Sequence, residues 1–439
     1  MYSTAHREGS SLGVIDSSLV SRLPLLLLQV RYHLLQPSSA KMRFSQVLST
    51  AIAAGVATAE PLANVLAANN NTLSTLNSIL AGMPQFTQAL TTISNITILA
   101  PSNDAFEKAM KAMPGLTNDM NMVTALLQYH VMSGVMMSTA FTETPKFVST
   151  FMGMPFSMVT GNQKVELVKM ENMAMIFSGF KQMSSVTKAD IAFDGGVVHV
   201  IDKVLTIPMS PSVTATDMGL TSLAGALTKT NMVMAVDSLS DVTIFAPSNK
   251  AFENIGSAAE SASVMDLSTI LSYHVLHGGD MAMFSTNLLM GSSAMSGTTM
   301  AMPGMANMPM RRQSMNSTPM TFATLQGGNV NVRMENGKVF VNSAQVTIAD
   351  IITSNGVIHV IDNVLNPMMA DAMPNPTATT QTPAFSGATP VQDAPFTEGI
   401  SPTTTITAGG MTGGAGVFAA MPTAAFLGAV GGAALLAGL

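Results

Sequence analysis

Four histidines are the side chains of this chain best suited to acid–base or metal chemistry. His130 and His274 each follow a tyrosine, whereas His199 and His359 each lie in a block that reads Gly-x-(Val/Ile)-His-Val-Ile-Asp. Imidazole can serve as a general base near neutral pH or bind zinc through a ring nitrogen. The chain has no cysteine, and no glutamate stands at ligand spacing beside these histidines. We therefore expect hydrogen-bonded core histidines and no metal site among them.

The parts of a serine triad are also present, but no pattern would assemble them. Ser102, His199 and Asp202 are the nearest set, and their spacing gives no reason for them to converge. The nucleophile elbow G-x-S-x-G, the P-loop and the dinucleotide fingerprint G-x-G-x-x-G are all absent from the sequence. We expect no catalytic residue, no cofactor and no enzymatic activity.

A methionine-rich loop, residues 281–320, is the second candidate for chemistry. Its methionines recur at M-x-M and M-x-x-M spacings: Met300, Met302, Met305, Met308 and Met310. Thioethers are soft ligands that suit Cu(I). The competing explanation is composition, since the chain holds 39 methionines in all. A cell-surface copper-binding protein is thus the alternative to the function developed below.

The four histidines and the candidate triad residues lie in sequence blocks that occur twice in the same order. ITILAPSNDAFEKA (Ile96–Ala109) returns as VTIFAPSNKAFENI (Val242–Ile255), the Tyr129-His130 pair returns as Tyr273-His274, and GGVVHVIDKVL returns as NGVIHVIDNVL. The long period indicates a tandem duplication in which each copy has its own core. We place the two domains at residues 62–207 and 210–366.

Local patterns predict how each copy folds. The ITILAP and VTIFAP runs indicate buried strands that end at Pro101 and Pro247, and Ser102 and Ser248 then stand where a helix N-cap belongs. Helical periodicity precedes each run, and alternating apolar segments follow it. Asn336-Gly337 predicts a tight hairpin turn. We expect an α+β protein in which each domain is a compact β-sandwich or wedge with several packed helices.

The C-terminus has the pattern of a glycosylphosphatidylinositol (GPI) attachment signal, residues 408–439. Small residues at Ala408 or Gly413 could accept the lipid, and a polar spacer and an uncharged apolar tail follow them. The alternative is a tail-anchoring helix, but the tail is short, rich in Gly and Ala, and without a basic flank. Ahead of the signal, residues 367–407 are rich in Ser, Thr and Pro and predict an O-glycosylated stalk.

A lipid anchor requires entry into the secretory route. Residues 42–59 supply a signal peptide, with a basic start, an apolar stretch and a small-residue cleavage pattern. We interpret residues 1–41 as a gene-model extension ahead of a true start at Met42. N-x-S/T sequons at Asn70, Asn95 and Asn316 then become candidate N-glycosylation sites. The net charge of −6, without a basic run, argues against nucleic acid as a partner.

The repeated blocks resemble the fasciclin domain family. Thr97–Phe106 and Thr243–Phe252 match its Thr-x-Phe-Ala-Pro-Ser-Asn-x-Ala-Phe stretch, with Leu99 in place of the Phe in the first copy. The Tyr-His pair and the closing Gly-x-(Val/Ile)-His-Val-Ile-Asp-x-Val-Leu block are present in both copies. The resemblance covers most of residues 62–366.

The resemblance implies a non-enzymatic adhesion or matrix module, held on the extracellular face of the plasma membrane or in the cell wall. Its partners would be an extracellular protein or glycan, the membrane through the lipid anchor, and other copies through homophilic contacts. The stalk and the anchor look more like those of a fungal wall protein. In animal members an Asp-Ile pair and the Tyr-His region are implicated in integrin binding. The corresponding adhesion candidates here are Asp190, Ile191, Tyr129, His130, Asp350, Ile351, Tyr273 and His274.

Overall fold

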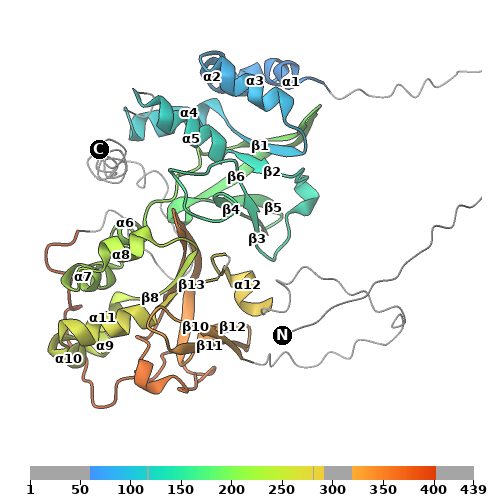
Figure 1. Ribbon diagram of the computed structural model, residues 1–439. Coiled ribbons are helices and arrows are strands. Elements are labelled where there is room, and N and C mark those ends of the chain that lie inside the picture. Colours follow the sequence, from blue (N-terminus) through green and yellow to red (C-terminus); the bar gives the residue numbers. More distant parts are fainter. Residues whose placement is uncertain (1–59, 116–117, 280, 291–318, 402–439) are drawn as a thin grey trace, which may run out of the picture. The chain divides into compact units, whose positions relative to one another are not determined.

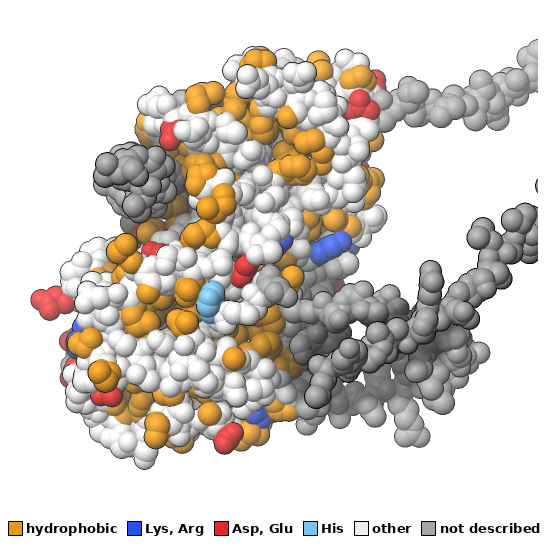
Figure 2. Space-filling model, viewed as in Figure 1, with side chains coloured by type: hydrophobic (Ala, Val, Ile, Leu, Met, Phe, Trp, Pro, Cys, Tyr) orange, Lys and Arg blue, Asp and Glu red, His pale blue; other side chains and the backbone are white. Residues whose placement is uncertain are grey.

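The computed structural model of the chain describes residues 60–401, except 116–117, 280 and 291–318 (Figure 1). All of the described residues belong to one compact unit. Two copies of one architecture follow each other along the chain, and each copy has helices packed on a seven-stranded sheet. None of the helices in the described part is long and apolar enough to cross a membrane. Charged side chains are sparse on the face seen in Figure 2, as expected for a sequence with 10% charged residues.

Domain 1 begins with three helices, which precede the first strand. Its elements are α1 (Leu62–Ala68), α2 (Asn70–Ala81), α3 (Pro84–Thr92), β1 (Ile96–Pro101), α4 (Asn103–Ala112), α5 (Met120–Tyr129), β2 (Val131–Ser133), η2 (Ser138–Ala140), β3 (Lys146–Ser149), β4 (Lys164–Met170), β5 (Met173–Phe177), η3 (Gly179–Lys181), β6 (Met183–Phe193) and β7 (Gly196–Ile201).

Domain 2 repeats this order with a longer connection before its hairpin strands. Its elements are α6 (Pro211–Asp217), α7 (Thr221–Lys229), α8 (Val233–Ser238), β8 (Val242–Pro247), α9 (Asn249–Asn254), α10 (Gly256–Ser261), α11 (Val264–Tyr273), β9 (Val275–Leu276), α12 (Ser285–Met290), β10 (Met320–Ala323), β11 (Asn329–Glu335), β12 (Lys338–Val341), β13 (Ala344–Thr353), β14 (Gly356–Ile361) and η5 (Pro367–Met369).

The two sheets have the same topology. Their strand orders are β2-β1-β7-β6-β5-β4-β3 and, in reverse notation, β10-β11-β12-β13-β14-β8-β9. The strand from the first repeated block pairs in parallel with the strand from the closing block, β1 with β7 and β8 with β14, and every other pairing is antiparallel. A bridge from Met132 to Thr150 brings the two edges of the first sheet together, so the sheet curls back on itself. The predicted α+β fold class is confirmed.

Several residues of the repeated blocks form strand ends and helix caps. Both strands end at the predicted prolines, and Ser102 and Ser248 accept hydrogen bonds from the amides of Ala105 and Ala251 as N-caps. The Asn336-Gly337 turn also forms as predicted, because both residues adopt positive φ between β11 and β12. The blocks therefore carry turn, cap and core functions of the fold.

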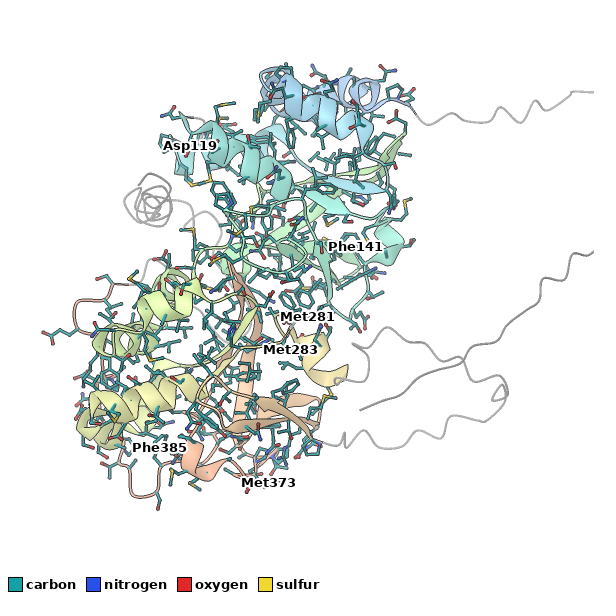
Figure 3. The ribbon with its side chains drawn as sticks, viewed as in Figure 1. Asp119, Phe141, Met281, Met283, Met373 and Phe385 are labelled. Carbon is teal, nitrogen blue, oxygen red and sulfur yellow. The ribbon has the colours of Figure 1, made fainter. Side chains whose placement is uncertain are left out.

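Residues 371–401, which we call the strap, differ from the predicted stalk. Their composition predicts disorder, yet they lie along domain 2, and Phe385, Phe396 and Ile400 pack against its core (Figure 3 shows Phe385). The prediction was wrong for this segment because a few apolar side chains, diluted among Thr, Pro and Ala, bury enough surface to hold it. Glycosylation of its exposed threonines stays a prediction, and residues 402–407 lie outside the described part.

Candidate functional site

The two histidines of the Tyr-His pairs are structural. His130 Nδ1 lies 2.7 Å from the carbonyl of Leu126, and its Nε2 accepts from the amide of Leu205 at 2.9 Å. The carbonyl can only accept, so the neutral ring carries its proton on Nδ1. His274 makes the same pair of contacts, with Ile270 and Leu365. Burial lowers the pKa of each histidine to about 4, against the weaker opposing effect of the carbonyl hydrogen bond.

The histidines of the closing blocks use the opposite tautomer. His199 Nδ1 accepts from the amide of Asp190 at 3.1 Å, so Nε2 carries the proton and donates to the carbonyl of Met136 at 2.6 Å. In domain 2, His359 makes the matching bonds with Asp350 and Met283. Burial lowers the pKa of His359, and the negative charge of Asp350 opposes that shift. Both nitrogens of every one of these rings are occupied, which leaves no free base.

Each of the two aspartates fastens a distant loop to the sheet. Asp190 adopts φ +59° at an irregularity in β6, and its carboxylate accepts from both the amide and the hydroxyl of Ser138. Asp350 adopts φ +63° in β13 and holds Ser285 in the same way, with a hydroxyl contact of 2.5 Å. Burial acts to raise the pKa of Asp190, but the bonds from Ser138 outweigh it and keep that pKa below its usual range.

The suggested serine triad does not form. The hydroxyl of Ser102 caps a helix, and Asp202 accepts from the amide of Ser185. Neither contacts His199, whose nitrogens bind backbone groups as described above. In the described part of the chain, no group of three or more His, Asp or Glu side chains could hold a metal ion.

Most of the predicted adhesion residues are buried, which corrects their proposed role as contact residues. Six of the eight have relative exposures of 3% or less: Tyr129, His130, Tyr273, His274, Asp350 and Ile351. The tyrosine hydroxyls donate to the carbonyls of Lys164 and Asn329 and so fix the hairpin strands. A buried side chain cannot touch a partner, because the surrounding core would have to open first. Only Asp190 and Ile191 reach the surface, and both are half-buried.

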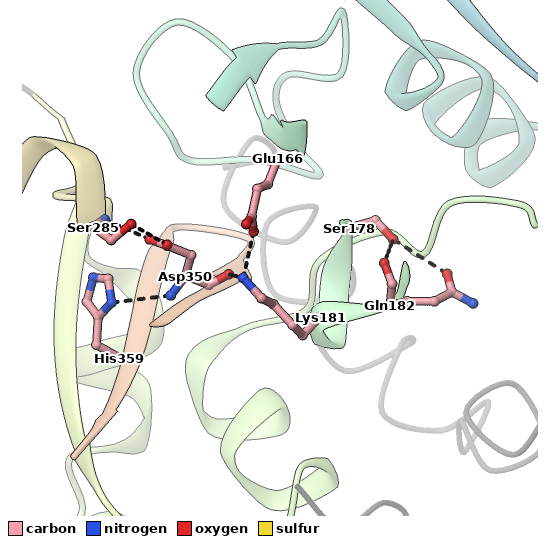
Figure 4. A network of polar contacts seen from close by, with 7 residues as sticks. All are labelled: Glu166, Ser178, Lys181, Gln182, Ser285, Asp350 and His359. Atoms are coloured by element: carbon pink, nitrogen blue, oxygen red, sulfur yellow. Dashed lines mark hydrogen bonds and ion pairs between the residues drawn. The ribbon is translucent and has the colours of Figure 1, made fainter. Parts of the chain in front are cut away.

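In domain 2 the surface around Asp350 is covered by domain 1. Lys181 from η3 donates to the carbonyl of Asp350 at 3.3 Å while it pairs with Glu166 of β4 at 2.6 Å (Figure 4). Burial raises the pKa of Glu166, and the positive charge of Lys181 opposes that rise. Phe180, the neighbour of Lys181, is 2% exposed and belongs to the core of domain 2.

Further contacts extend this interface along both domains. Phe147 of β3 stacks on Phe284 with ring centroids 4.1 Å apart. Thr160 donates through its amide and its hydroxyl to the carboxylate of Asp241, at 2.8 and 2.6 Å. The side-chain amide of Gln163 donates to the carbonyl of Thr353 at 3.0 Å. Domain 2 thus binds another protein domain, and we call the part of its interface around Asp350 the domain-2 corner: Ala282, Phe284, Asp350, Ile351 and Ile352.

In the described part of the chain, no second domain covers the equivalent surface of domain 1. The Ser138–Asp190–His199 contacts of domain 1 match the Ser285–Asp350–His359 contacts of domain 2 and so align the two loops. In this alignment Met137 corresponds to Phe284, and Val135 corresponds to Ala282. Met137 and Val135 are 41% and 42% exposed, whereas Phe284 and Ala282 are 4% and 0% exposed. We call this surface the domain-1 corner: Val135, Met137, Asp190, Ile191 and Ala192. It is partly apolar, and the bonds from Ser138 to Asp190 fasten its loop to the sheet. The repeated sequence blocks alone do not reveal this difference in exposure between the two copies.

The remaining predicted sites divide between exposed residues and residues outside the described part. Asn70 and Asn95 are both exposed, which leaves room for a glycan on each, and glycosylation stays a prediction. Asn316, the copper candidates from Met300 to Met310, the signal peptide and the attachment residues Ala408 and Gly413 lie outside the described residues. Met281 and Met283, at the start of the methionine-rich loop, are described and lie just before α12 (Figure 3).

Sequence reasoning missed the residues that join the domains. Lys181 and Glu166 lie outside the repeated blocks, and nothing in their local sequence marks them as partners. A usable signal was present nonetheless. Domain 1 inserts several residues between β5 and β6 where domain 2 has a tight connection, and insertions that break a repeat often carry copy-specific contacts.

Comparison with known proteins identifies the architecture. The fasciclin domain model matches residues 71–208 and 218–367. A fasciclin-like arabinogalactan protein of Arthroderma benhamiae is 33% identical over 78% of this chain and 75% of its own length. Another, from Phaeosphaeria nodorum, is 27% identical over 69% of this chain and 87% of its own.

A solved structure is also similar, the FAS1 domain pair from the insect cell adhesion molecule Fasciclin I. It shares 18% sequence identity and covers 68% of this chain and 98% of its own, with a TM-score of 0.32. The family assignment itself rests on the two matched domains and on the fungal relatives. This chain belongs to the fasciclin domain family and contains two of its domains in tandem.

Proposed function

We propose that this chain is a surface-anchored adhesion protein whose domain-1 corner is the adhesive face. Membership of the fasciclin family supports adhesion or matrix interaction in general terms. The observation that carries the specific proposal is the difference between the copies. One corner binds a protein domain, and the other, built on the same Ser–Asp–His frame, exposes Val135 and Met137 to solvent.

The occupied corner indicates the chemistry of a partner for the open one. In domain 2 the occupant supplies an aromatic ring, an ammonium group and a side-chain amide donor, from Phe147, Lys181 and Gln163. Exposed apolar side chains at the domain-1 corner suit a partner of this kind, because an aromatic ring would bury their apolar area, and the carbonyl of Asp190 corresponds to the one that Lys181 contacts in domain 2. We therefore infer an extracellular protein ligand, which the domain-1 corner holds by binding and does not convert chemically.

The way the chain is attached to the cell is the second part of the proposal. The sequence patterns of residues 408–439 and 42–59, which predict an attachment signal and a signal peptide, support a GPI anchor on the extracellular face of the membrane or a transfer to the cell wall. The strap modifies the role of the stalk, because the chain is packed on domain 2 as far as residue 400. We therefore expect only residues 402–407 or 402–412 to separate the packed strap from the candidate attachment residues Ala408 and Gly413.

Treatment of intact cells with phosphatidylinositol-specific phospholipase C tests anchoring and adhesion together. We expect the enzyme to release the full ectodomain into the medium and to abolish attachment of the cells to their substratum. Cells that carry the same ectodomain on a transmembrane segment serve as the control and should keep their attachment after treatment. Retention of the protein in the membrane fraction of treated cells would contradict the lipid anchor, and unchanged attachment after complete release would contradict the adhesive function.

A further inference from the structure

Methionine is the large apolar side chain that this surface exposes. In the described part of the chain, sixteen large hydrophobic side chains are exposed, and thirteen of them are methionines. Leucine has the opposite distribution, because Leu325 is the one exposed leucine among the described side chains and the others pack in or against the core. Methionine is ordinarily a residue of the protein interior. A bias of composition alone would distribute methionine as leucine is distributed, so its exposure is a property of this surface.

The exposed methionines are spread over both domains. Met137 belongs to the domain-1 corner, and the other twelve lie outside it. Domain 1 holds six of the twelve: Met110, Met120, Met154, Met170, Met173 and Met183. Domain 2 and the segment that follows it hold the other six: Met234, Met265, Met281, Met368, Met369 and Met373. A reagent in the solvent therefore reaches thioethers on either domain, and a modified side chain at these positions lies outside the core.

Other readily oxidised side chains are missing from the chain or buried. The sequence has no cysteine, no tryptophan and only four tyrosines. The two tyrosines that the structure describes, Tyr129 and Tyr273, are 0% and 1% exposed. Reductases convert methionine sulfoxide back to methionine, whereas the sulfonic acid of cysteine is a dead end. The described surface thus concentrates the side chain whose oxidation can be reversed.

Hydrogen-bond donors already stand beside two of the exposed sulfur atoms. Arg333 Nη1 donates to Met373 Sδ at 2.8 Å, and the Nε atom of this buried guanidinium has no hydrogen-bond partner among the described residues. Asn287 Nδ2 donates to Met281 Sδ at 3.2 Å. A thioether is a weak acceptor, whereas a sulfoxide carries a polar oxygen that accepts well. At both positions the oxidised side chain would keep its neighbour as a donor.

We propose that the twelve exposed methionines form a second functional surface, which consumes hydroperoxides. In each step a lone pair of the thioether sulfur attacks the terminal peroxide oxygen, an S–O bond forms and the O–O bond breaks. The leaving oxygen keeps the electron pair of that bond and receives the proton of the attacked oxygen. Sulfur is oxidised by two electrons, and one hydroperoxide yields one sulfoxide and one water or alcohol. This activity is independent of adhesion, since it uses methionines outside the domain-1 corner.

Peptide mapping of the full chain after treatment with hydrogen peroxide tests this surface. We expect the twelve positions to take up oxygen at rates within about threefold of the rate of N-acetylmethionine in the same solution. The buried methionines should stay reduced, and the urea midpoint of unfolding should not change: Met83, Met132, Met152, Met175 and Met218. Oxidation of the buried methionines together with the exposed ones, or a midpoint that falls with the first oxygens taken up, would overturn the proposal, because oxidation would then be damage.

Replacement of the twelve methionines by glutamine measures how much peroxide they consume. Glutamine has a similar length and no sulfur, so the variant chain should consume twelve fewer equivalents of hydrogen peroxide than the natural chain. Two variants that each replace the six methionines of one group should each show half of this difference, and they carry the test if the complete variant does not fold. Val264→Gln/Leu325→Gln, which alters two exposed apolar residues without sulfur, is the matched control and should consume as much as the natural chain. Equal consumption by the natural chain and the methionine variants would overturn the proposal.

Discussion

Acidification from pH 6.5 to pH 4 is expected to remove about 3 kcal/mol of unfolding free energy from each domain. His130 and His274 have a native pKa of about 4, below the ordinary value of 6.5. The native state resists protonation of these histidines and the unfolded state does not. The unfolding free energy is therefore unaffected by their protonation above pH 6.5, and it decreases as the pH falls from 6.5 to 4. Protonation at Nε2 also breaks the hydrogen bond from Leu205 or Leu365.

Urea unfolding as a function of pH measures this effect. His130→Gln should lower the stability of domain 1 at pH 7, but the further loss of stability of that domain between pH 6.5 and pH 4 should be much smaller than in the natural chain. The exposed His277 offers the matched control, and His277→Gln should leave the acid dependence as it is in the natural chain. If the unfolding free energy of domain 1 decreases between pH 6.5 and pH 4 as much in His130→Gln as in the natural chain, this histidine is not the cause of the decrease.

Replacement of Lys181 by methionine is expected to destabilise the domain pair by about 3 kcal/mol at pH 7. Lys181 is 19% and Glu166 only 5% exposed in their ion pair, so the substitution leaves an uncompensated carboxylate inside the interface. The carbonyl of Asp350 also loses the hydrogen bond that the Lys181 ammonium donates to it. Removing one member of a buried pair is far more damaging than removing both.

The pH dependence of this loss follows from the pKa of Glu166. Burial already raises that pKa in the natural chain, and loss of Lys181 raises it further. A carboxyl with a raised native pKa favours the folded state at low pH and opposes it as the pH increases. The destabilisation by Lys181→Met should therefore be largest near neutral pH and shrink under acid conditions, where Glu166 is protonated.

Two control variants make the measurement specific. Lys181→Met/Glu166→Gln should recover most of the lost free energy, because no unpaired charge stays buried. Lys250→Met removes a lysine that is 72% exposed in its pair with Glu253, and it should change stability by at most about 0.5 kcal/mol. An equal effect of Lys181→Met and Lys250→Met would show that the interface ion pair is solvent-exposed, contrary to the structure.

The repeated blocks predicted the fold well because their constraints are local. A proline that ends a strand, a serine that caps a helix and an Asn-Gly turn each act within a few residues, so Ser102, Ser248 and Asn336 could be interpreted without tertiary information. The same property limited the prediction of the site. Asp190 and Asp350 have nearly the same neighbours in sequence, yet one is half-exposed and the other buried, because the covering domain lies far away along the chain.

The strap shows where composition misleads. A content of Thr, Pro and Ala describes the average residue of the segment, whereas its docking depends on Phe385, Val391 and Phe396 and on glycines more than a hundred residues earlier. Neither the pairing of Phe396 with Gly225 nor that of Lys181 with Asp350 leaves a mark in a single sequence. Contacts of this kind between distant segments can only be found in the folded chain.

Adhesion by cells that display the full chain with Met137→Asp is the most direct test of the domain-1 corner. The change places a carboxylate at the centre of the proposed face, and Met265→Asp places one on a 79% exposed residue of domain 2 as the matched control. We predict that Met137→Asp weakens adhesion about tenfold or more at equal surface expression, and that Met265→Asp leaves it intact. Full adhesion by the Met137→Asp protein would contradict the assignment of the adhesive face to domain 1.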